Sequence, residues 1–365
     1  MKKLMLLLVV VLAMTMAACS PSDNGGPTKR TYELALITDV GTIDDKSFNQ
    51  GSWEGLKAYA EEHNISYKYY APAEKSTSAY INSIDLAVEN GAKVIVTPGF
   101  LFEPAIYEAQ DLYPDVKFVL LDGTPNDNDW TNGPKFKINE NVYSVFYAEE
   151  QVGFLAGYAA VKDGFTNLGF MGGMAVPAVV RFGYGFVQGA DYAAAELGIN
   201  VNVKYTYLGG FGPSAEYQTQ AATWYQSGVE VIFAAAGGAG NSVMAAAEAN
   251  NGKVIGVDID QKDDSTTVIT SAMKGLGVSV YMALEDYYAG NFKGGVSETL
   301  DVTVDGVSLS DDFSRFTTFS KADYDAIFKA LVDNTDNVRT NIKGDAGVEK
   351  VTDLSFTNTA VELIG

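Results

Sequence analysis

The chain has 365 residues, with 25 Lys or Arg against 46 Asp or Glu, and a formal net charge of −21. Nucleic-acid binding needs basic surface that displaces counterions, so this acidity argues against a nucleic-acid partner. About 335 residues follow the N-terminal segment, more than one hydrophobic core usually holds, and we therefore expect two lobes.

The N-terminal segment indicates secretion. A basic start (MKK) precedes an apolar run over residues 4–13, which is far shorter than the roughly 20 residues that a membrane-spanning helix needs. Residues 16–19 (MAAC) resemble the lipobox of bacterial lipoproteins, in which the cysteine is lipidated and becomes the mature first residue; a plain signal peptide is the alternative. We predict a signal peptide over 1–18 and lipid attachment, palmitate included, at Cys19.

Residues 20–30 (SPSDNGGPTKR) cannot bury a core, so we predict a flexible tether over 19–30 that holds the folded part at the extracytoplasmic face of the cell membrane. No later apolar run is long enough to span a membrane. Cys19 is the only cysteine, so its use as an anchor leaves no disulfide and no thiol chemistry.

From residue 31 onward, short β-branched runs alternate with helical patterns. We expect strands over 32–38, 66–71, 93–97, 117–121, 167–171, 201–207, 230–235, 253–257 and 267–270. We expect helices near 48–62, 77–89, 103–112, 148–162, 183–197, 214–227, 240–250, 274–290 and 321–333. Runs such as 94–96 (VIV) are apolar on both faces, as in a parallel sheet covered by helices, so the fold class is α/β.

The strand–helix pattern runs twice, over about 31–140 and about 165–270, which predicts two similar lobes. We assign 31–140 with a returning segment of about 272–305 to the first lobe, and 141–271 with about 306–340 to the second. Residues 301–308 (DVTVDGVS) suggest an Asp-Gly hairpin, and 341–365 form a tail without a clear assignment. Open α/β sheets bind ligands at the carboxyl ends of their strands, which would face a cleft between the lobes.

The first strand end carries several candidate ligand contacts. Ser47 and Gln50 have the spacing of a capping box, which would start a helix at Phe48 and place its ring at the mouth of the cleft. Packing of Phe48 under the loop is the alternative. Asp39 is placed to accept ligand hydroxyl protons, or otherwise to cap loop amides.

Other strand ends repeat the pattern. Asp122 follows the fourth strand, and Phe211 lies in the turn 209–213 (GGFGP), where it mirrors Phe48. Two such rings would sandwich a flat ligand, with each contact worth about 1–3 kcal/mol if base stacking is a guide; two core aromatics are the alternative.

Three more features follow later strands. The loop 236–241 (AGGAGN) offers backbone amides to an anion or a hydroxyl, but it lacks the third glycine of a dinucleotide fingerprint. Asp258 and Lys274 each follow a strand. The acidic stretch after Asp258 lacks the glycine and the distal glutamate of an EF-hand calcium loop.

Residues for catalysis or metal binding are scarce. His63 is the only histidine and lies in a polar helical stretch, so Cys–His pairs, Ser–His pairs and His/Cys metal spacing are absent from the sequence. We therefore expect that the protein is not an enzyme and that it binds no cofactor and no metal ion. Two aspartates that converge for glycoside hydrolysis are the one enzymatic alternative.

The stretch 38–50 (TDVGTIDDKSFNQ) closely resembles the opening motif of the basic membrane protein (BMP) family of lipoproteins. Supporting strings occur in the same order at 99–101 (GFL), 151–157 (QVGFLAG), 172–174 (GGM), 236–238 (AGG), 256–261 (GVDIDQ) and 270–274 (TSAMK). Members resemble a purine nucleoside receptor and serve as substrate-binding components of nucleoside ABC transporters.

The resemblance implies a two-lobed type I periplasmic-binding fold, in which each lobe is a parallel sheet flanked by helices and the ligand lies between the lobes. It also implies a purine stacked between Phe48 and Phe211, although 211–216 (FGPSAE) departs from the commoner FNDPA pattern. The remaining ligand contacts map onto Asp39, Asn49, Asp122, Gly238, Asp258 and Lys274. The implied partners are a nucleoside, an ABC permease and its ATPase.

Two further alternatives share the fold. A related binder would take riboflavin or a sugar, and paired aromatic rings favour a flat ring over a sugar. A LacI-like regulator is disfavoured by the secretion signal and by the lack of a basic DNA-binding segment.

Overall fold

The structure, a computed structural model, describes residues 31–364. The predicted signal peptide, the tether and the lipidation site Cys19 lie outside the described residues.

The first lobe is built on a six-stranded sheet in which every pair of neighbours is parallel. From edge to edge its strands are β11 (Val296–Leu300), β5 (Val142–Tyr147), β4 (Lys117–Leu121), β3 (Val94–Pro98), β1 (Leu34–Ile37) and β2 (Tyr67–Tyr70). The helices of this lobe are α1 (Phe48–Glu62), α2 (Thr77–Glu89), α3 (Glu103–Leu112) and α8 (Leu276–Tyr288).

Alternation along β1 divides the first lobe into two apolar layers, because successive side chains of a strand point to opposite faces. Leu34 and Leu36 share a buried cluster with Leu56 of α1 and Leu284 of α8. Ala35 and Ile37 pack instead in the cluster formed by α2 and α3. The sheet is therefore covered on both faces, as its continuous apolar strands predict.

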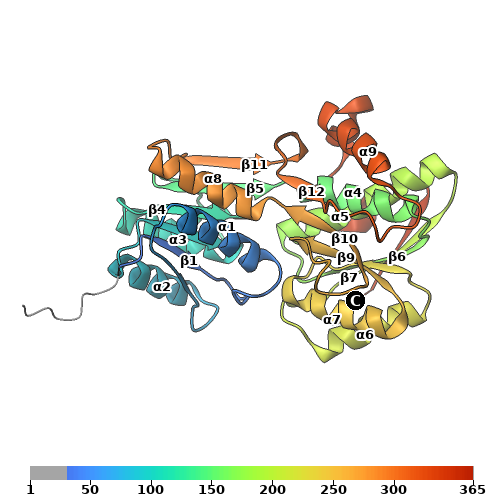
Figure 1. The fold of residues 1–365 in the computed structure, drawn as a ribbon, viewed down its shortest axis with the longest axis horizontal. Helices are drawn as coiled ribbons and strands as arrows, with labels where there is room; N and C mark the ends of the chain where they lie inside the picture. Colours follow the sequence, from blue (N-terminus) through green and yellow to red (C-terminus); the bar gives the residue numbers. More distant parts are fainter. Residues whose placement is uncertain (1–30, 365) are drawn as a thin grey trace, which may run out of the picture. The chain divides into compact units, whose positions relative to one another are not determined.

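The second lobe holds a seven-stranded sheet (Figure 1). Its order is β12 (Val307–Leu309), β10 (Val268–Lys274), β9 (Lys253–Asp258), β8 (Val231–Phe233), β6 (Asn167–Gly172), β7 (Val201–Tyr207) and β13 (Thr359–Leu363). Only the pairing of β12 with β10 is antiparallel. The helices are α4 (Glu149–Lys162), α5 (Pro177–Leu197), α6 (Ala215–Gln226), α7 (Gly240–Asn250), α9 (Lys321–Asp333) and the short α10 (Val338–Asn341). The predicted α/β class with parallel-dominated sheets is confirmed.

Helices α4 and α5 approach each other closely because glycines face the contact. An ideal Cβ at Gly157 would lie 1.9 Å from the Phe186 carbonyl oxygen, and one at Gly189 would lie 1.9 Å from that of Phe154. Any larger residue at these two positions would push the helices apart. This close pair carries α4 across the second sheet and fixes its first turn beside the cleft.

The chain passes between the lobes three times: from β5 to α4, from β10 to α8, and from β11 to β12. These crossings run close together, since the Ala148 amide donates to Leu300 O (3.0 Å) and the Gly275 amide donates to Gly306 O (2.9 Å). The crossings bring the ends of β5 and β10 to one place, where the site described below is built.

Several expected boundaries differ from the structure. No strand was expected at 142–147, and 141–271 was assigned to the second lobe, yet β5 pairs with β4 in the first sheet. The suggested hairpin at 301–308 is wrong, because β11 and β12 belong to different sheets. Helix α5 begins at Pro177, before the expected 183, and the unassigned tail supplies β13 beside β7. Long-range pairing, which local pattern does not report, decides the strand cases, whereas α5 begins early with a proline in its first turn.

Candidate ligand-binding site

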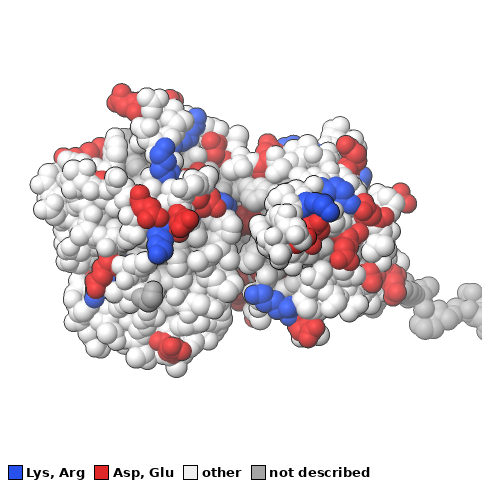
Figure 2. Space-filling view, turned by 180° about the vertical axis from the view of Figure 1, so that it is seen from behind, with Lys and Arg blue, Asp and Glu red and all other residues white. Residues whose placement is uncertain are grey.

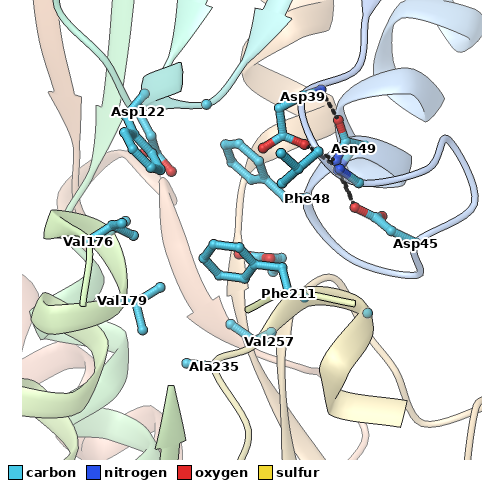
Figure 3. A pocket seen from close by; sticks show the side chains of 18 of the residues that line it. Asp39, Asp45, Phe48, Asn49, Asp122, Val176, Val179, Phe211, Ala235 and Val257 are labelled. Atoms are coloured by element: carbon cyan, nitrogen blue, oxygen red, sulfur yellow. Dashed lines mark hydrogen bonds between the residues drawn. The ribbon is translucent and has the colours of Figure 1, made fainter. Parts of the chain in front are cut away.

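A cavity of about 600 Å³ lies between the two lobes, at the carboxyl ends of strands from both sheets. Its size is within the range of small-molecule sites. All eight residues predicted as ligand contacts line it: Asp39, Phe48, Asn49, Asp122, Phe211, Gly238, Asp258 and Lys274. Figure 3 shows how several of them face the cavity from opposite lobes.

Asp45, rather than Ser47, organises the start of α1. Its carboxylate accepts hydrogen bonds from the backbone amides of Ser47 (2.9 Å), Asn49 (3.0 Å) and Gln50 (3.1 Å). The helix begins at Phe48 as predicted, but the Ser47 side chain makes no capping bond. The expected Ser47–Gln50 capping box is therefore wrong, because Ser47 bonds to the other lobe instead.

Asn49 and Asp39 form a fixed pair in the cavity wall. The Asn49 Nδ2 group donates to Asp39 Oδ1 (3.0 Å) and to Asp45 Oδ2 (2.9 Å), and the Asp39 amide donates to Asn49 Oδ1 (3.3 Å) (Figure 3). The Gly41 amide also donates to Asp39 Oδ1 (2.8 Å). Asn49 thus orients Asp39 through the nitrogen and the oxygen of its side-chain amide. The Oδ2 oxygen of Asp39 is left available to a ligand.

Phe48 and Phe211 present aromatic rings to the cavity from the two lobes (Figure 3). Phe48 stands in the first turn of α1. The loop that carries Phe211 is fixed by its own carbonyl oxygen, which accepts a hydrogen bond from the Ala239 amide (2.7 Å). Both rings are partly buried against the main core cluster, so each combines a packing role with an exposed face.

A buried cluster of charges forms the floor of the cavity around Lys274, the last residue of β10. Its ammonium nitrogen lies 2.5 Å from Asp122 Oδ2, 2.8 Å from Glu149 Oε1 and 3.9 Å from Asp258 Oδ1. The side chains are almost inaccessible, at 3% exposure for Lys274 and 0% for Glu149. The same ammonium lies 4.9 Å from the centroid of the Phe48 ring, close enough for a cation–π contact.

Burial raises the pKa values of the carboxyl groups in this cluster, and the nearby charge of Lys274 lowers them. Burial raises the pKa of Asp122 to about 7 against the lowering effect of Lys274, and burial also raises the pKa of Asp258 and of Asp39. Burial alone would raise the pKa of Glu149, but the charges of Lys274 and Arg181 outweigh it and hold that pKa below its ordinary value. Burial opposes the charge of Lys274, yet its three carboxylate neighbours raise its pKa.

Asp122 has an unused hydrogen-bonding oxygen. Its Oδ2 atom bonds to Lys274, whereas Oδ1 is buried and has no hydrogen-bond partner among residues 31–364. A buried acceptor without a partner costs free energy of about 1–3 kcal/mol.

Direct contacts join the two lobes beside Phe48. Ser47 Oγ donates to Asp258 Oδ2 (2.5 Å), Gln261 Nε2 donates to the Lys46 carbonyl oxygen (2.7 Å), and Lys46 Nζ pairs with Asp264 (2.8 Å). Since Asp258 and Phe48 both line the cavity, these contacts describe a closed arrangement in which the lobes meet around the ligand space.

Many lining residues were not predicted from the sequence, among them one arginine and two exposed aromatic residues. Arg181 lines the cavity, and its Nε group lies 2.6 Å from Glu149 Oε2. A single arginine within the otherwise apolar run 177–187 was the available signal. Trp130 and Phe136 also line the cavity although they are 66% and 57% exposed, and no local pattern marks their loop.

On the face shown in Figure 2, lysine and arginine side chains lie singly or in small groups among acidic and uncharged ones. This face therefore has no extended basic patch of the kind that nucleic-acid binding uses. Among residues 31–364, no three or more His, Cys, Asp and Glu side chains are grouped to hold a metal ion. Within that same range, no helix is both long enough and apolar enough to cross a membrane.

Comparison with known structures and families agrees with this fold and cleft. A solute-binding protein of an ABC transporter system from Aeropyrum pernix K1 is 26% identical, with a TM-score of 0.67 over 88% of this chain and 90% of that one. The two lobes with a ligand cavity between them define a solute-binding protein of the periplasmic-binding type.

The family profile described as ABC transporter substrate-binding protein PnrA-like matches residues 32–337. The ABC transporter nucleoside-binding protein BmpA of Lactococcus lactis subsp. cremoris (strain MG1363) is 32% identical over 88% of this chain and 93% of its own. Basic membrane protein D of Borreliella burgdorferi (strain JD1) is 31% identical over 80% of this chain and 82% of its own. The chain belongs to this PnrA-like, or BMP, family of ABC transporter substrate-binding proteins.

Proposed function

We propose that the protein binds nucleosides, and purine nucleosides in particular, in the interlobe cavity and delivers them to an ABC importer. The observation that carries the proposal is the placement of Phe48 and Phe211 on opposite lobes of one cavity whose floor holds carboxylates. The name of the similar Lactococcus protein, which specifies nucleoside binding, supports it.

The chemistry of a nucleoside matches the two parts of the cavity. A flat base stacks on aromatic rings, each contact being worth about 1–3 kcal/mol. Ribose hydroxyls donate hydrogen bonds, and Asp39, whose Oδ2 is left free by Asn49 and Gly41, lines the cavity as an acceptor. An uncharged nucleoside also avoids repulsion from the carboxylates, which would cost a phosphorylated ligand a few kcal/mol.

Capture proceeds by closure of the lobes about the three crossings, as in other hinged binding proteins. The contacts of Lys46 and Ser47 with Asp258, Gln261 and Asp264 then hold the closed form. A permease recognises this form, and a lipid anchor at Cys19 keeps the protein concentrated beside it at the extracytoplasmic face of the membrane. The ligand leaves chemically unchanged.

A thermal-shift panel on the mature protein tests the assignment. Purine and pyrimidine nucleosides, free bases, riboflavin and ribose are compared, and a nucleoside at 100 times its dissociation constant should add about 2.7 kcal/mol to the free energy of unfolding. If riboflavin or ribose stabilises the protein and no nucleoside does, the nucleoside assignment is wrong. Chromatography of the same samples checks that the ligand has not been hydrolysed, as a cleft hydrolase would require.

A further inference from the structure

Glu149 stands behind the cavity rather than in it. It is the first residue of α4, directly after the crossing from β5, and its side chain is 0% exposed. It does not belong to the cavity lining, whereas Lys274 and Arg181 do. Glu149 therefore acts on a ligand through its charge and through these two cations rather than by direct contact.

Each carboxylate oxygen of Glu149 lies beside a different cation, Arg181 or Lys274. Glu149 Oε2 accepts a hydrogen bond from Arg181 Nε (2.6 Å). Oε1 lies 2.8 Å from Lys274 Nζ, an ion pair without hydrogen-bond geometry among residues 31–364. Its place in the first turn of a 14-residue helix also favours the ionised carboxylate, because the N-terminal end of a helix carries partial positive charge. Glu149 is thus a fixed negative charge between Arg181 and Lys274.

The other charges around the two cations are few. Lys274 also meets Asp122 and Asp258, and Arg181 meets Asp345 at 3.4 Å, where the Asp345 side chain is 35% exposed. The buried members of the group are therefore two cations and three carboxylates, with Glu149 the only carboxylate that contacts both cations. Without Glu149, Lys274 would keep Asp122 and Asp258, whereas Arg181 would keep only the half-buried Asp345 and the nearby carboxyl of Glu150.

An arginine and a lysine that share a cavity make a strong site for phosphate when their charges are free. The planar guanidinium binds phosphate oxygens through two parallel hydrogen bonds, and the ammonium adds a point charge. Here both groups reach the cavity wall but are already paired from behind. The pairing with Glu149 withholds them from an anionic ligand.

We infer that Glu149 is a positioning residue that makes the cavity selective for uncharged nucleosides over nucleoside monophosphates. It neutralises Arg181 and Lys274 from outside the cavity, so that a phosphate group meets no free cation among the carboxylates. This inference rests on the proposed nucleoside function for its choice of ligand, but its charge argument concerns any phosphate-bearing molecule.

Glu149→Gln keeps the size of the side chain and removes its charge. The test measures the dissociation constants of adenosine, AMP and inorganic phosphate by calorimetry on the wild-type protein and on this variant. The ratio of the AMP constant to the adenosine constant should fall by about tenfold or more in the variant, since one buried unit charge near the ligand is removed. Phosphate alone should also bind more tightly to the variant.

Three further variants separate charge from structure. Glu149→Asp keeps the charge and should preserve the wild-type ratio. The double variant Glu149→Gln/Arg181→Gln removes one charge of each sign and should return the ratio towards that of the wild type. Glu196→Gln is the matched surface control, because Glu196 pairs with Lys162 in the same lobe at 38% exposure and lies outside the cavity lining.

The outcomes are distinct. Equal losses of adenosine and AMP affinity in Glu149→Gln, with no gain for phosphate, would show a merely structural role and overturn the inference. Failure of the wild-type protein to bind adenosine would overturn the proposed function, whereas the phosphate measurement would still decide the charge argument. If thermal melting shows that Glu149→Gln does not fold, Arg181→Gln tests the inference with the opposite sign, and an unchanged or lower ratio in that variant contradicts it.

Discussion

Phe48 combines two roles that a single substitution can separate. Its ring lines the cavity and lies near the Lys274 ammonium, while part of it packs against the core. The sequence placed this residue at the start of a helix beside the cleft, and the structure confirms that position. Its contact with a ligand remains a prediction.

Phe48→Ala should weaken nucleoside binding by about 10- to 100-fold, the equivalent of the roughly 1–3 kcal/mol of one stacking contact. Calorimetry measures the affinity, and urea unfolding of the ligand-free protein measures the stability. Phe48→Leu is the matched variant, because it retains apolar bulk but lacks the aromatic face, and it should also bind weakly. A large loss of stability in Phe48→Ala together with wild-type affinity in Phe48→Leu would indicate that the ring only packs.

At the same scale, the strand-end carboxylates were predictable from the sequence, but the ion pair of Glu149 and Arg181 was not. Asp39, Asp122 and Asp258 were predictable because parallel strands deliver their carboxyl ends to one edge of a sheet. Glu149 and Arg181 were not, since they come from two helices whose close packing depends on glycines at the contact. Asn49 was predicted to bind the ligand, and the structure shows that its amide is already used to orient Asp39.

The start of α1 shows how an element and the site share one residue. Asp45 accepts hydrogen bonds from three backbone amides of the first turn and from the Asn49 side chain, which in turn holds Asp39. The neighbouring Asp44 is exposed and makes no hydrogen bond within residues 31–364. The two adjacent aspartates therefore provide a matched pair.

Asp45→Ala should lower the free energy of unfolding by about 1–2 kcal/mol through loss of the cap. It should also weaken ligand binding, because Asn49 loses the bond that orients it towards Asp39. Asp44→Ala should change the free energy of unfolding by no more than a few tenths of a kcal/mol. It is a control for stability alone, because Asp44 also lines the cavity. Urea unfolding of both variants compares their stability, and calorimetry measures ligand binding to Asp45→Ala. Similar losses of stability from the two substitutions would refute the assignment of the cap to Asp45.

Helices and strands differed in how well their sequences predicted them. The boundaries of α1, α2, α3 and α9 match their periodic apolar patterns. Strands β11 and β13 were missed, because each is a short, partly exposed edge strand that gains its structure by pairing with β5 or β7. Such strands are specified by their neighbours in the sheet rather than by their own pattern.

For the molecule as a whole, buried acids make stability depend on pH. Burial, together with the nearby Glu149 anion, raises the pKa of Glu150 to about 7 in the folded protein. A carboxyl whose folded pKa exceeds its unfolded value stabilises the fold most below the unfolded value, near 4.5, and loses that contribution as the pH rises through 7. The ionised form of Glu150 thus destabilises the protein at neutral pH.

Glu150→Gln should therefore gain stability relative to the wild-type protein as the pH increases from 4.5 to 8, by on the order of 2 kcal/mol. Urea unfolding of both proteins across this range measures the difference. Asp323→Asn supplies the opposite sign, because hydrogen bonds from Ser320 lower the pKa of Asp323, so its contribution is lost as the pH falls. A difference between Glu150→Gln and the wild-type protein that does not change with pH would contradict the burial of an ionisable Glu150.

The three crossings have a consequence for how the protein withstands cleavage. Three crossings connect the lobes. A single cut in any one of them therefore leaves two covalent connections between the lobes. The two chain fragments also remain paired in the sheets, for example through β11 with β5 and β12 with β10. A nicked molecule is therefore expected to stay assembled through its remaining crossings and its sheet pairings.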